Sequence, residues 1–308
     1  MAAKGSRSPG RLIEMPDTRH LPRASRGVAK MRFRATLRRE LAHHDIVHST
    51  VRLDYLKPAL NRDIPKVLNF QNHVTAAEIA RVSRDARGPI VFTACGSKMI
   101  DHVKHLGDWR TVHNCVPVDS YSRRKPADPP YVVFLGRITR VKGAHTAIHA
   151  ALDAGVAIKV AGLAGSAPDD AQYFEEIDSL FRKRGVEYVG EVDDAAKGLL
   201  LGGAVALLNP VEWDEPFGIV NIEALACGTP VIAYPRGEIP EIVRPGVTGM
   251  LVEDVAAMVR AIREVSSIDR DACRADAATR FDVSVMTDRF VDIYEAVLRK
   301  AGHGSATG

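Results

Sequence analysis

The sequence predicts an α/β protein with two parallel-sheet domains, and three observations support this prediction. Short apolar runs alternate with amphipathic stretches from Asp45 onward, as they do in βα units. A stretch rich in proline and charge, at 122–130, interrupts this alternation, and proline can neither continue a helix nor donate to a sheet ladder. The chain of 308 residues is long enough for two domains of ordinary size.

Residues 1–44 are expected to form a basic arm that is poorly ordered or partly helical. Residues 1–40 hold eleven Lys and Arg against three acids, a net charge of +8, whereas the whole chain carries +4. Such an arm can contact an anionic membrane surface. It lacks a series of aromatic residues interleaved with the basic ones for stacking on bases, so nucleic acid is not an expected partner.

The composition predicts a cytoplasmic protein. The sequence has no stretch of ~18 uninterrupted apolar residues, which a membrane span needs, and its basic start lacks the apolar region of a signal peptide. Four cysteines lie far apart without a Cys-x-x-Cys pair, which fits reduced thiols rather than a disulfide framework or a zinc ribbon. We therefore expect no metal; an oligomer is compatible with the sequence.

The first domain is predicted over residues 45–125 and is the less regular of the two. Two of its segments, Ala76–Arg84 and Met99–Leu106, are expected to be helices. Its predicted strands are Asp45–His48, Lys66–Phe70, Ile90–Thr93 and Thr111–His113.

The second domain, over residues 131–283, is predicted to be a complete Rossmann-like domain, followed by a helix over 284–301. Six strands joined by helices commonly adopt the order 3-2-1-4-5-6. The predicted strands are Tyr131–Leu135, Ala157–Ala161, Glu187–Val189, Val205–Asn209, Val231–Tyr234 and Gly249–Val252. The helices are expected near Ala144–Asp153, Asp170–Arg184, Asp194–Leu201, Gly218–Cys227 and Val255–Val265.

This strand order puts the first and fourth strands side by side, and ligands bind beyond the carboxyl ends of such strands. The loop after the first strand, Gly136–Gly143, holds Arg137 and Lys142. The guanidinium group of arginine can bind two oxygens at once and the ammonium group of lysine is a compact charge, so together they suit a diphosphate. It has neither a dinucleotide fingerprint nor a Walker sequence, which disfavours a dehydrogenase or an NTPase. Two merely exposed basic residues are the alternative interpretation.

The loop after the fourth strand leads into a helix that begins near Gly218. The amides of Phe217, Gly218 and Ile219 form a helix N-terminus suited to phosphate oxygens. Glu215 lies just before the helix, where it can accept hydrogen bonds from sugar hydroxyls, and Glu223 on the second turn can hold a ribose diol. Alternatively, Glu215 only stabilises the start of the helix. The two loops together predict a site for a nucleotide diphosphate bearing a hydroxylated group.

Three segments carry a resemblance to a known family: YVVFLGRITRVKG at 131–143, EPFGIVNIEALACGTPVIA at 215–233 and RGEIPEIV at 236–243. They resemble the retaining GT-B glycosyltransferases of family four, the glycogen-synthase-like and mannosyltransferase-like group. The resemblance implies a GT-B fold whose second domain binds a nucleotide-sugar donor and transfers its sugar to an acceptor hydroxyl, without a metal or other cofactor. It assigns Arg137 and Lys142 to the donor diphosphate, Glu215 to the sugar and Glu223 to the ribose.

The resemblance implies further donor contacts from Gly136, the amides of the 217–219 turn, and Val189 and Val192 in the segment that would meet the base. In the first domain, DIVHS at 45–49, VLNFQNH at 67–73 and HNCVPVDSY at 113–121 match more loosely, with Cys115 where glycine is usual. His73 is expected near the donor phosphate or the reacting sugar, and Gln71 competes with it for this role.

The beginning of the chain departs from the family. Residues 1–44 show no strand leading into a glycine-rich turn, so we expect a shortened first domain that lacks on the order of sixty residues. The WDEPFG and HNCVPVDSY segments are most similar to those of bacterial small-molecule glucosyltransferases, including pterin glucosyltransferases. This similarity favours UDP-glucose as the donor, with GDP-mannose second. A truncated nucleotide-sugar-binding protein without transferase activity is the alternative function.

Overall fold

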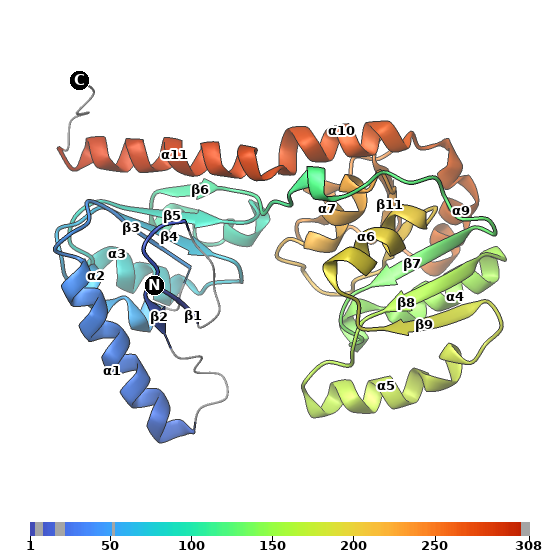
Figure 1. Ribbon diagram of the computed structural model, residues 1–308, viewed down its shortest axis with the longest axis horizontal. Helices are drawn as coiled ribbons and strands as arrows, with labels where there is room; N and C mark the ends of the chain where they lie inside the picture. The colour runs from blue at the N-terminus through green and yellow to red at the C-terminus, as the bar shows by residue number, and fades with distance from the viewer. Residues whose placement is uncertain (4–8, 16–21, 51–52, 303–308) are drawn as a thin grey trace. The chain divides into compact units, whose positions relative to one another are not determined.

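The computed structural model describes residues 1–3, 9–15, 22–50 and 53–302, so parts of the predicted basic arm, at 4–8 and 16–21, lie outside the described residues. The chain forms two compact units, which are coloured along the chain in Figure 1. The first unit comprises Met1–Ala94, Ile100–Arg110 and Phe290–Gly308, and the second comprises Cys95–Met99 and Thr111–Arg289.

The second unit contains a six-stranded parallel sheet with the order β12-β11-β10-β7-β8-β9. Counted from the first strand of this unit, the order is 3-2-1-4-5-6, which confirms the prediction. The first and fourth strands are neighbours, so the loops that follow them leave the same edge of the sheet. The strands are β7 (Tyr131–Leu135), β8 (Ala157–Ala161), β9 (Val186–Gly190), β10 (Leu207–Asn209), β11 (Val231–Ala233) and β12 (Gly249–Leu251).

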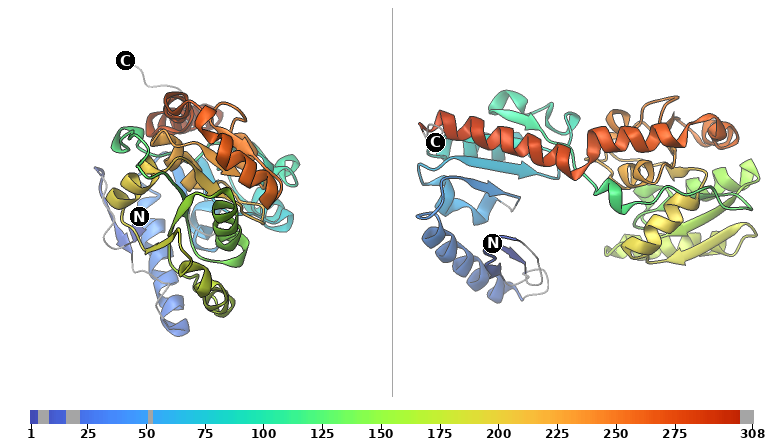
Figure 2. Two further views of the ribbon diagram at one scale, coloured as in Figure 1. Left: turned by 90° about the vertical axis from the view of Figure 1, so that its right-hand side faces the viewer. Right: turned by 45° about the horizontal axis from the view of Figure 1, so that its top comes forward.

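Helices cover both faces of this sheet (Figures 1 and 2). Val132 and Phe134 of β7 point into a core shared with α4, α5 and α9. Tyr131 points to the other face, where its hydroxyl donates to the carbonyl of Leu200 in α6. Burial on both faces explains why β7 is apolar throughout. The helices are α4 (Ala144–Ala154), α5 (Pro168–Phe181), α6 (Asp194–Gly203), α7 (Ile219–Ala226), α8 (Ile239–Ile242), α9 (Val255–Glu264) and α10 (Arg270–Phe281).

The first unit contains a four-stranded sheet with the order β3-β4-β5-β6 and a separate parallel pair, β1 and β2. Its helix α3 begins at a capping box in which Thr75 and Glu78 satisfy each other's backbone N–H. The long helix α11 (Val283–Lys300) belongs to this unit from Phe290 onward. The other elements are β1 (Ala2–Ala3), β2 (Glu14–Met15), α1 (Arg23–Glu40), β3 (Val47–Ser49), α2 (Lys57–Leu60), β4 (Lys66–Phe70), α3 (Ala76–Asp85), β5 (Ile90–Ala94) and β6 (Trp109–Thr111).

Two predicted elements of the first domain were wrong. The expected helix Met99–Leu106 is replaced by two 3₁₀ turns, Lys98–Ile100 and Lys104–Leu106. The backbone hydrogen bonds in this segment join residues three apart, as in a 3₁₀ helix. The Met99 N–H donates to the Glu238 side chain rather than to a backbone carbonyl. The expected strand Thr111–His113 is shifted to Trp109–Thr111, since the Trp109 ring packs against the ring of Phe92 with centroids 5.0 Å apart.

Candidate functional site

The loop after β7 is fixed to the loop after β10 by backbone contacts. Glu212 N–H donates to the carbonyl of Val141 over 2.8 Å. Gly143, with φ of 75°, lies so close to the second loop that a Cβ atom there would be 2.4 Å from the carbonyl oxygen of Pro210. Only glycine adopts this conformation and permits this approach without strain. The two loops are therefore held together at the edge of the sheet.

Lys142 and Glu215 meet where these loops adjoin. The Lys142 ammonium donates to Glu215 Oε2, and the indole N–H of Trp213 donates to the same oxygen over 2.9 Å. The Lys142 Nζ also lies 5.5 Å from the centroid of the Trp213 ring. The side chains of Lys142 and Glu215 are 21% and 12% exposed, so the pair is mostly buried but still in contact with solvent. Arg137 is exposed on the first of the two loops.

Glu215 leads directly into the N-terminus of α7. Gly218 takes φ of 86° and precedes Ile219, the first helical residue. The first N–H groups of a helix have no acceptor within the helix, and they carry the positive end of its dipole. Phe217 is buried behind this turn, and Ile219 is 46% exposed. Anion-binding groups and a carboxylate thus adjoin within a few residues.

Glu223 is a buried carboxylate with two partners that the sequence did not predict. Its Oε1 accepts hydrogen bonds from Lys197 Nζ over 2.6 Å and from the Tyr121 hydroxyl over 3.1 Å. Burial, together with the charge of Glu223, raises the pKa of Tyr121 to about 12. The pKa of Lys197 is raised because hydrogen bonds to Glu223 and Asp194 outweigh its burial, which alone would lower it. Lys197 is therefore charged and paired with Glu223.

The remaining predicted donor residues of this unit lie at the same edge of the sheet. The backbones of β7 and β8 approach closely there, because a Cβ on Gly162 would be 1.8 Å from the carbonyl oxygen of Gly136. Val189, in the neighbouring strand β9, is 37% exposed, and Val192 lies in the loop that follows. Since parallel strands end at one edge, these residues line the same side as Lys142.

His73 belongs to the first unit, where it lies exposed in the loop between β4 and α3. Gln71, its competitor for the same role, donates from its amide to Asn69 Oδ1 over 3.3 Å. The active-site role expected for His73 stays a prediction.

A second group of polar residues supports Glu215 from behind and was not predicted. Glu238 N–H donates to the carbonyl of Glu215 over 3.0 Å. The Glu238 carboxyl accepts from the Met99 N–H over 2.8 Å. Nearby, Glu241 accepts from the Ser97 hydroxyl, and its Oε2 lies 3.4 Å from His113 Nε2. The only available signal was two glutamates three residues apart in RGEIPEIV.

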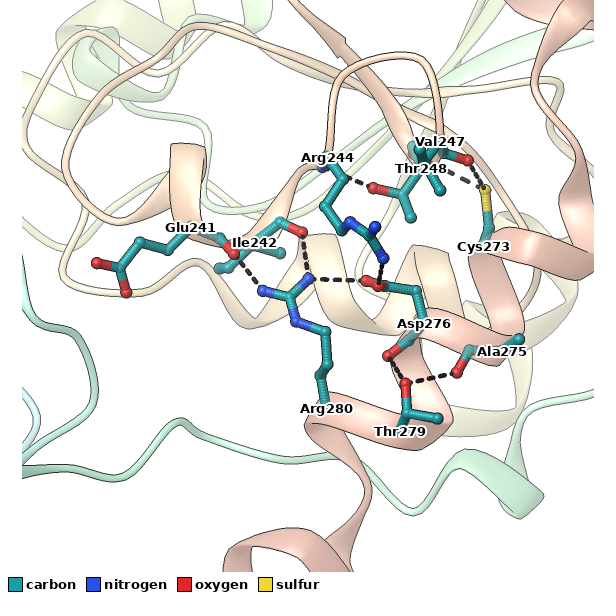
Figure 3. Close-up of polar contacts among 10 residues, drawn as sticks. All are labelled: Glu241, Ile242, Arg244, Val247, Thr248, Cys273, Ala275, Asp276, Thr279 and Arg280. Atoms are coloured by element: carbon teal, nitrogen blue, oxygen red, sulfur yellow. Dashed lines mark hydrogen bonds and ion pairs between the residues drawn. The ribbon is translucent and has the colours of Figure 1, made fainter.

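Helix α10 anchors the segment that carries this group, as Figure 3 shows. Arg280 donates to the carbonyl oxygens of Glu241 and Ile242 at the end of α8, and to Asp276 Oδ2 over 2.8 Å. The buried Asp276 also accepts from Arg244 over 2.8 Å. These contacts satisfy carbonyl groups that the end of a helix leaves without partners, and they fix α8 relative to the sheet.

Within the described ranges, no three His, Cys, Asp or Glu side chains gather in a way that could hold a metal ion. The same part of the chain holds no helix with the length and apolar character required to cross a membrane.

Comparison with known proteins places residues 118–280 in the family model of glycosyl transferases group 1. Alpha-maltose-1-phosphate synthase of Mycolicibacterium smegmatis is 38% identical over 157 residues, which are 47% of this chain and 40% of that protein. The chain thus spans less than half of that relative's length. D-inositol 3-phosphate glycosyltransferase of Mycobacterium avium is 28% identical over 313 residues, covering 87% of this chain and 73% of the relative.

Among solved structures, the Anabaena protein HepE in complex with UDP and glucose matches with a TM-score of 0.70. The match has 19% sequence identity and covers 85% of this chain and 80% of that protein. This likeness confirms the predicted fold class, an α/β fold with two Rossmann-like units of the GT-B type.

Proposed function

The chain belongs to the glycosyl transferases of group 1, and on this basis we propose that it transfers a hexose from a nucleotide-diphosphate sugar to an acceptor hydroxyl with retention of anomeric configuration. The observation that carries the proposal is the contact between Lys142 and Glu215 beside the N-terminus of α7. A cation, a carboxylate and free helix amides there match the diphosphate and the hydroxyl groups of one ligand.

In the proposed reaction, the bond between the sugar and the diphosphate breaks and negative charge grows on the leaving phosphate. Arg137, Lys142 and the amides of residues 217–219 are donors to that charge, and preorganised donors of this kind lower a barrier most effectively. Glu215 accepts hydrogen bonds from the sugar hydroxyls and orients the ring. The acceptor attacks on the same face as the departing diphosphate, whose oxygen takes the acceptor's proton.

We propose UDP-glucose as the first candidate donor and GDP-mannose as the second. The Anabaena structure with UDP and glucose supports this order. Val189 and Val192 would contact the base, Glu223 the ribose and Gly136 the diphosphate. Because Arg137 and Lys142 supply positive charge at the phosphates, we propose that transfer needs no metal ion, so EDTA should leave the rate unchanged.

Lys142→Ala tests the assignment, with Lys183→Ala as its control because Lys183 is exposed on the same unit. Slow hydrolysis of UDP-glucose and of GDP-mannose would be measured, together with calorimetric binding of each donor. We expect Lys142→Ala to lose hydrolysis by a factor of at least about 100, the effect of losing one oxyanion donor. An unchanged rate in Lys142→Ala would refute the proposed role. Donor binding without hydrolysis or transfer by the wild type would instead favour a nucleotide-sugar-binding protein.

Helix α1 favours peripheral contact with an anionic membrane as an additional property. It exposes Met31 (65%) and Val28 (47%), and Arg32 and Arg38 are also exposed. Apolar side chains flanked by arginines suit the interface of a membrane with negative lipids. We expect cosedimentation with phosphatidylserine vesicles that is lost in Met31→Asp and at high salt. Equal binding to phosphatidylcholine vesicles would count against it.

A further inference from the structure

The backbone of Glu215 rests on Gly237 and Glu238. Besides the hydrogen bond from Glu238 N–H to the Glu215 carbonyl, Gly237 lies so close that a Cβ atom there would be 2.2 Å from the same carbonyl oxygen. Gly237 adopts φ of 54°, which favours glycine. The backbone segment that carries the Glu215 side chain is therefore packed directly against Gly237 and Glu238.

Glu238 is only 1% exposed, and the backbone amides of Met99 and Lys98 donate to its carboxyl group. Oε1 accepts from the Met99 N–H, whereas the buried Oε2 has no hydrogen-bond partner within the described part of the chain. The Glu241 carboxylate is a close neighbour that raises the pKa of Glu238. Two ionised carboxylates so placed would repel each other, whereas a proton on Oε2 can be donated to Glu241.

The surrounding charges determine which of the two acids holds this proton. Glu241 has other donors, since it accepts from the Ser97 hydroxyl and lies beside His113. Arg280 donates to the Glu241 carbonyl group. The pKa of His113 is lowered by burial and by Arg289, and His113 is therefore mostly neutral at neutral pH. Burial raises the pKa of Glu238 to about 7, and the charge of Glu241 adds to this effect, although hydrogen bonds from the backbone amides of Met99 and Lys98 lower the pKa. Below this pH the proton accordingly resides mainly on Glu238.

We propose that Glu238 is a positioning residue for Glu215: as a neutral acid that donates its proton to Glu241, it keeps its backbone N–H on the Glu215 carbonyl, and its ionisation displaces that loop. The catalytic consequence rests on the function proposed above. Loss of the proton would then move Glu215 away from Lys142 and Trp213, so the rate of transfer would fall as the pH rises.

Trp213 provides a direct readout, because its indole N–H donates to Glu215. The chain has two tryptophans, Trp109 and Trp213. In the variant Trp109→Phe, Trp213 is therefore the only source of tryptophan fluorescence. In this background we expect a change in emission with a midpoint near pH 7. The change should be absent in Glu238→Gln, whose amide can donate to Glu241 at every pH. It should persist in Glu175→Gln, which removes an exposed glutamate elsewhere in the same unit.

Glu241→Gln is a second variant that keeps the test decisive if Glu238→Gln does not fold. Removing the neighbouring charge should lower the midpoint by about one pH unit or more. An infrared band of a protonated carboxyl group, present at pH 6 and missing in Glu238→Gln, would support the assignment. The assignment of the proton to Glu238 would be overturned by any of three results. These are no transition in the wild type, an unchanged midpoint in Glu241→Gln, or the same transition in Glu238→Gln.

The activity measurement separates this inference from the proposed function. We expect kcat to fall at least tenfold between pH 6 and pH 8.5 in the wild type and to remain high over this range in Glu238→Gln, with a smaller change in KM. A parallel fall in both proteins would overturn the positioning role. If the wild type transfers no sugar at any pH, the proposed function fails, while the fluorescence titration still decides the state of Glu238.

Discussion

Replacing Gly143 by alanine tests whether the close contact between the two site loops matters. Gly143 and Gly155 flank helix α4 with φ of 75° and 76°, so alanine meets the same left-handed conformation at both positions. That conformation costs about 1–2 kcal/mol, offset by about 0.4–1 kcal/mol of entropy lost from the unfolded chain. We therefore expect Gly155→Ala, whose Cβ would meet nothing within 4 Å, to lose about 1 kcal/mol of unfolding free energy.

Gly143→Ala adds a collision with backbone atoms. Its Cβ would lie 2.4 Å from the Pro210 carbonyl oxygen and 3.1 Å from the Pro210 Cγ, and overpacking of this kind costs about 1–3 kcal/mol more. Urea unfolding of both variants measures the difference. The loops must also separate, so Lys142 should move away from Glu215. Calorimetry should then show weaker binding of UDP-glucose, the proposed donor, in Gly143→Ala alone. Equal losses of stability and of binding in the two variants would refute this reasoning.

Three further expectations concern the surroundings of the site. Asp276→Ala should lower the free energy of unfolding in urea by about 2–3 kcal/mol, because Arg280 and Arg244 lose the buried carboxylate that both contact. The contact with Arg244 contributes less, since the Arg244 side chain is 56% exposed. A loss equal to that of Ala275→Ser would contradict this expectation. Glu238 has a pKa raised in the folded state, so it contributes stability that is fully present below its unfolded pKa and is lost as pH rises through about 7. Thermal unfolding from pH 5 to 8.5 should show this decline in the wild type and a weaker one in Glu238→Gln. Tyr121→Phe should lower the free energy of unfolding by about 1 kcal/mol, because it deletes the hydrogen bond to Glu223. Urea unfolding of the variant and the wild type measures this difference, and equal stability would mean that the hydrogen bond contributes nothing.

The fold of the second unit was predictable because the sequence patterns that determine it are local. Each apolar run is one strand, and the right-handed crossover rule leaves few ways to order six of them. That order placed the loop of Lys142 beside the loop of Glu215, and the structure brings the two side chains into contact. Gly218 marked the start of α7 because glycine readily takes the left-handed conformation found there. Element ends were less certain, as the shifted strand Trp109–Thr111 shows.

The partners of the site residues were not predictable from sequence patterns. Tyr121 reaches Glu223 across 102 residues of chain and Lys197 across 26, and no periodic pattern links such positions. The burial of a charged group is also invisible in a sequence. Nothing in the RGEIPEIV segment indicates that Glu238 is enclosed, and only the structure shows it. Such groups depend on tertiary packing, which the local rules do not determine.

The ion pair between Lys142 and Glu215 has a consequence for selectivity. Each of these side chains already satisfies the other, so an incoming molecule gains little by engaging only one of them. An anion that captures Lys142 leaves the carboxylate with the Trp213 indole alone, and a neutral sugar that captures Glu215 leaves the ammonium without its counterion. Only a molecule that brings an anion and hydroxyl groups together can replace both halves of the pair at once. For the proposed nucleotide-sugar donor, the pair should therefore discriminate against free phosphate and free sugar, because each of them supplies only one of the two groups that an intact nucleotide sugar brings.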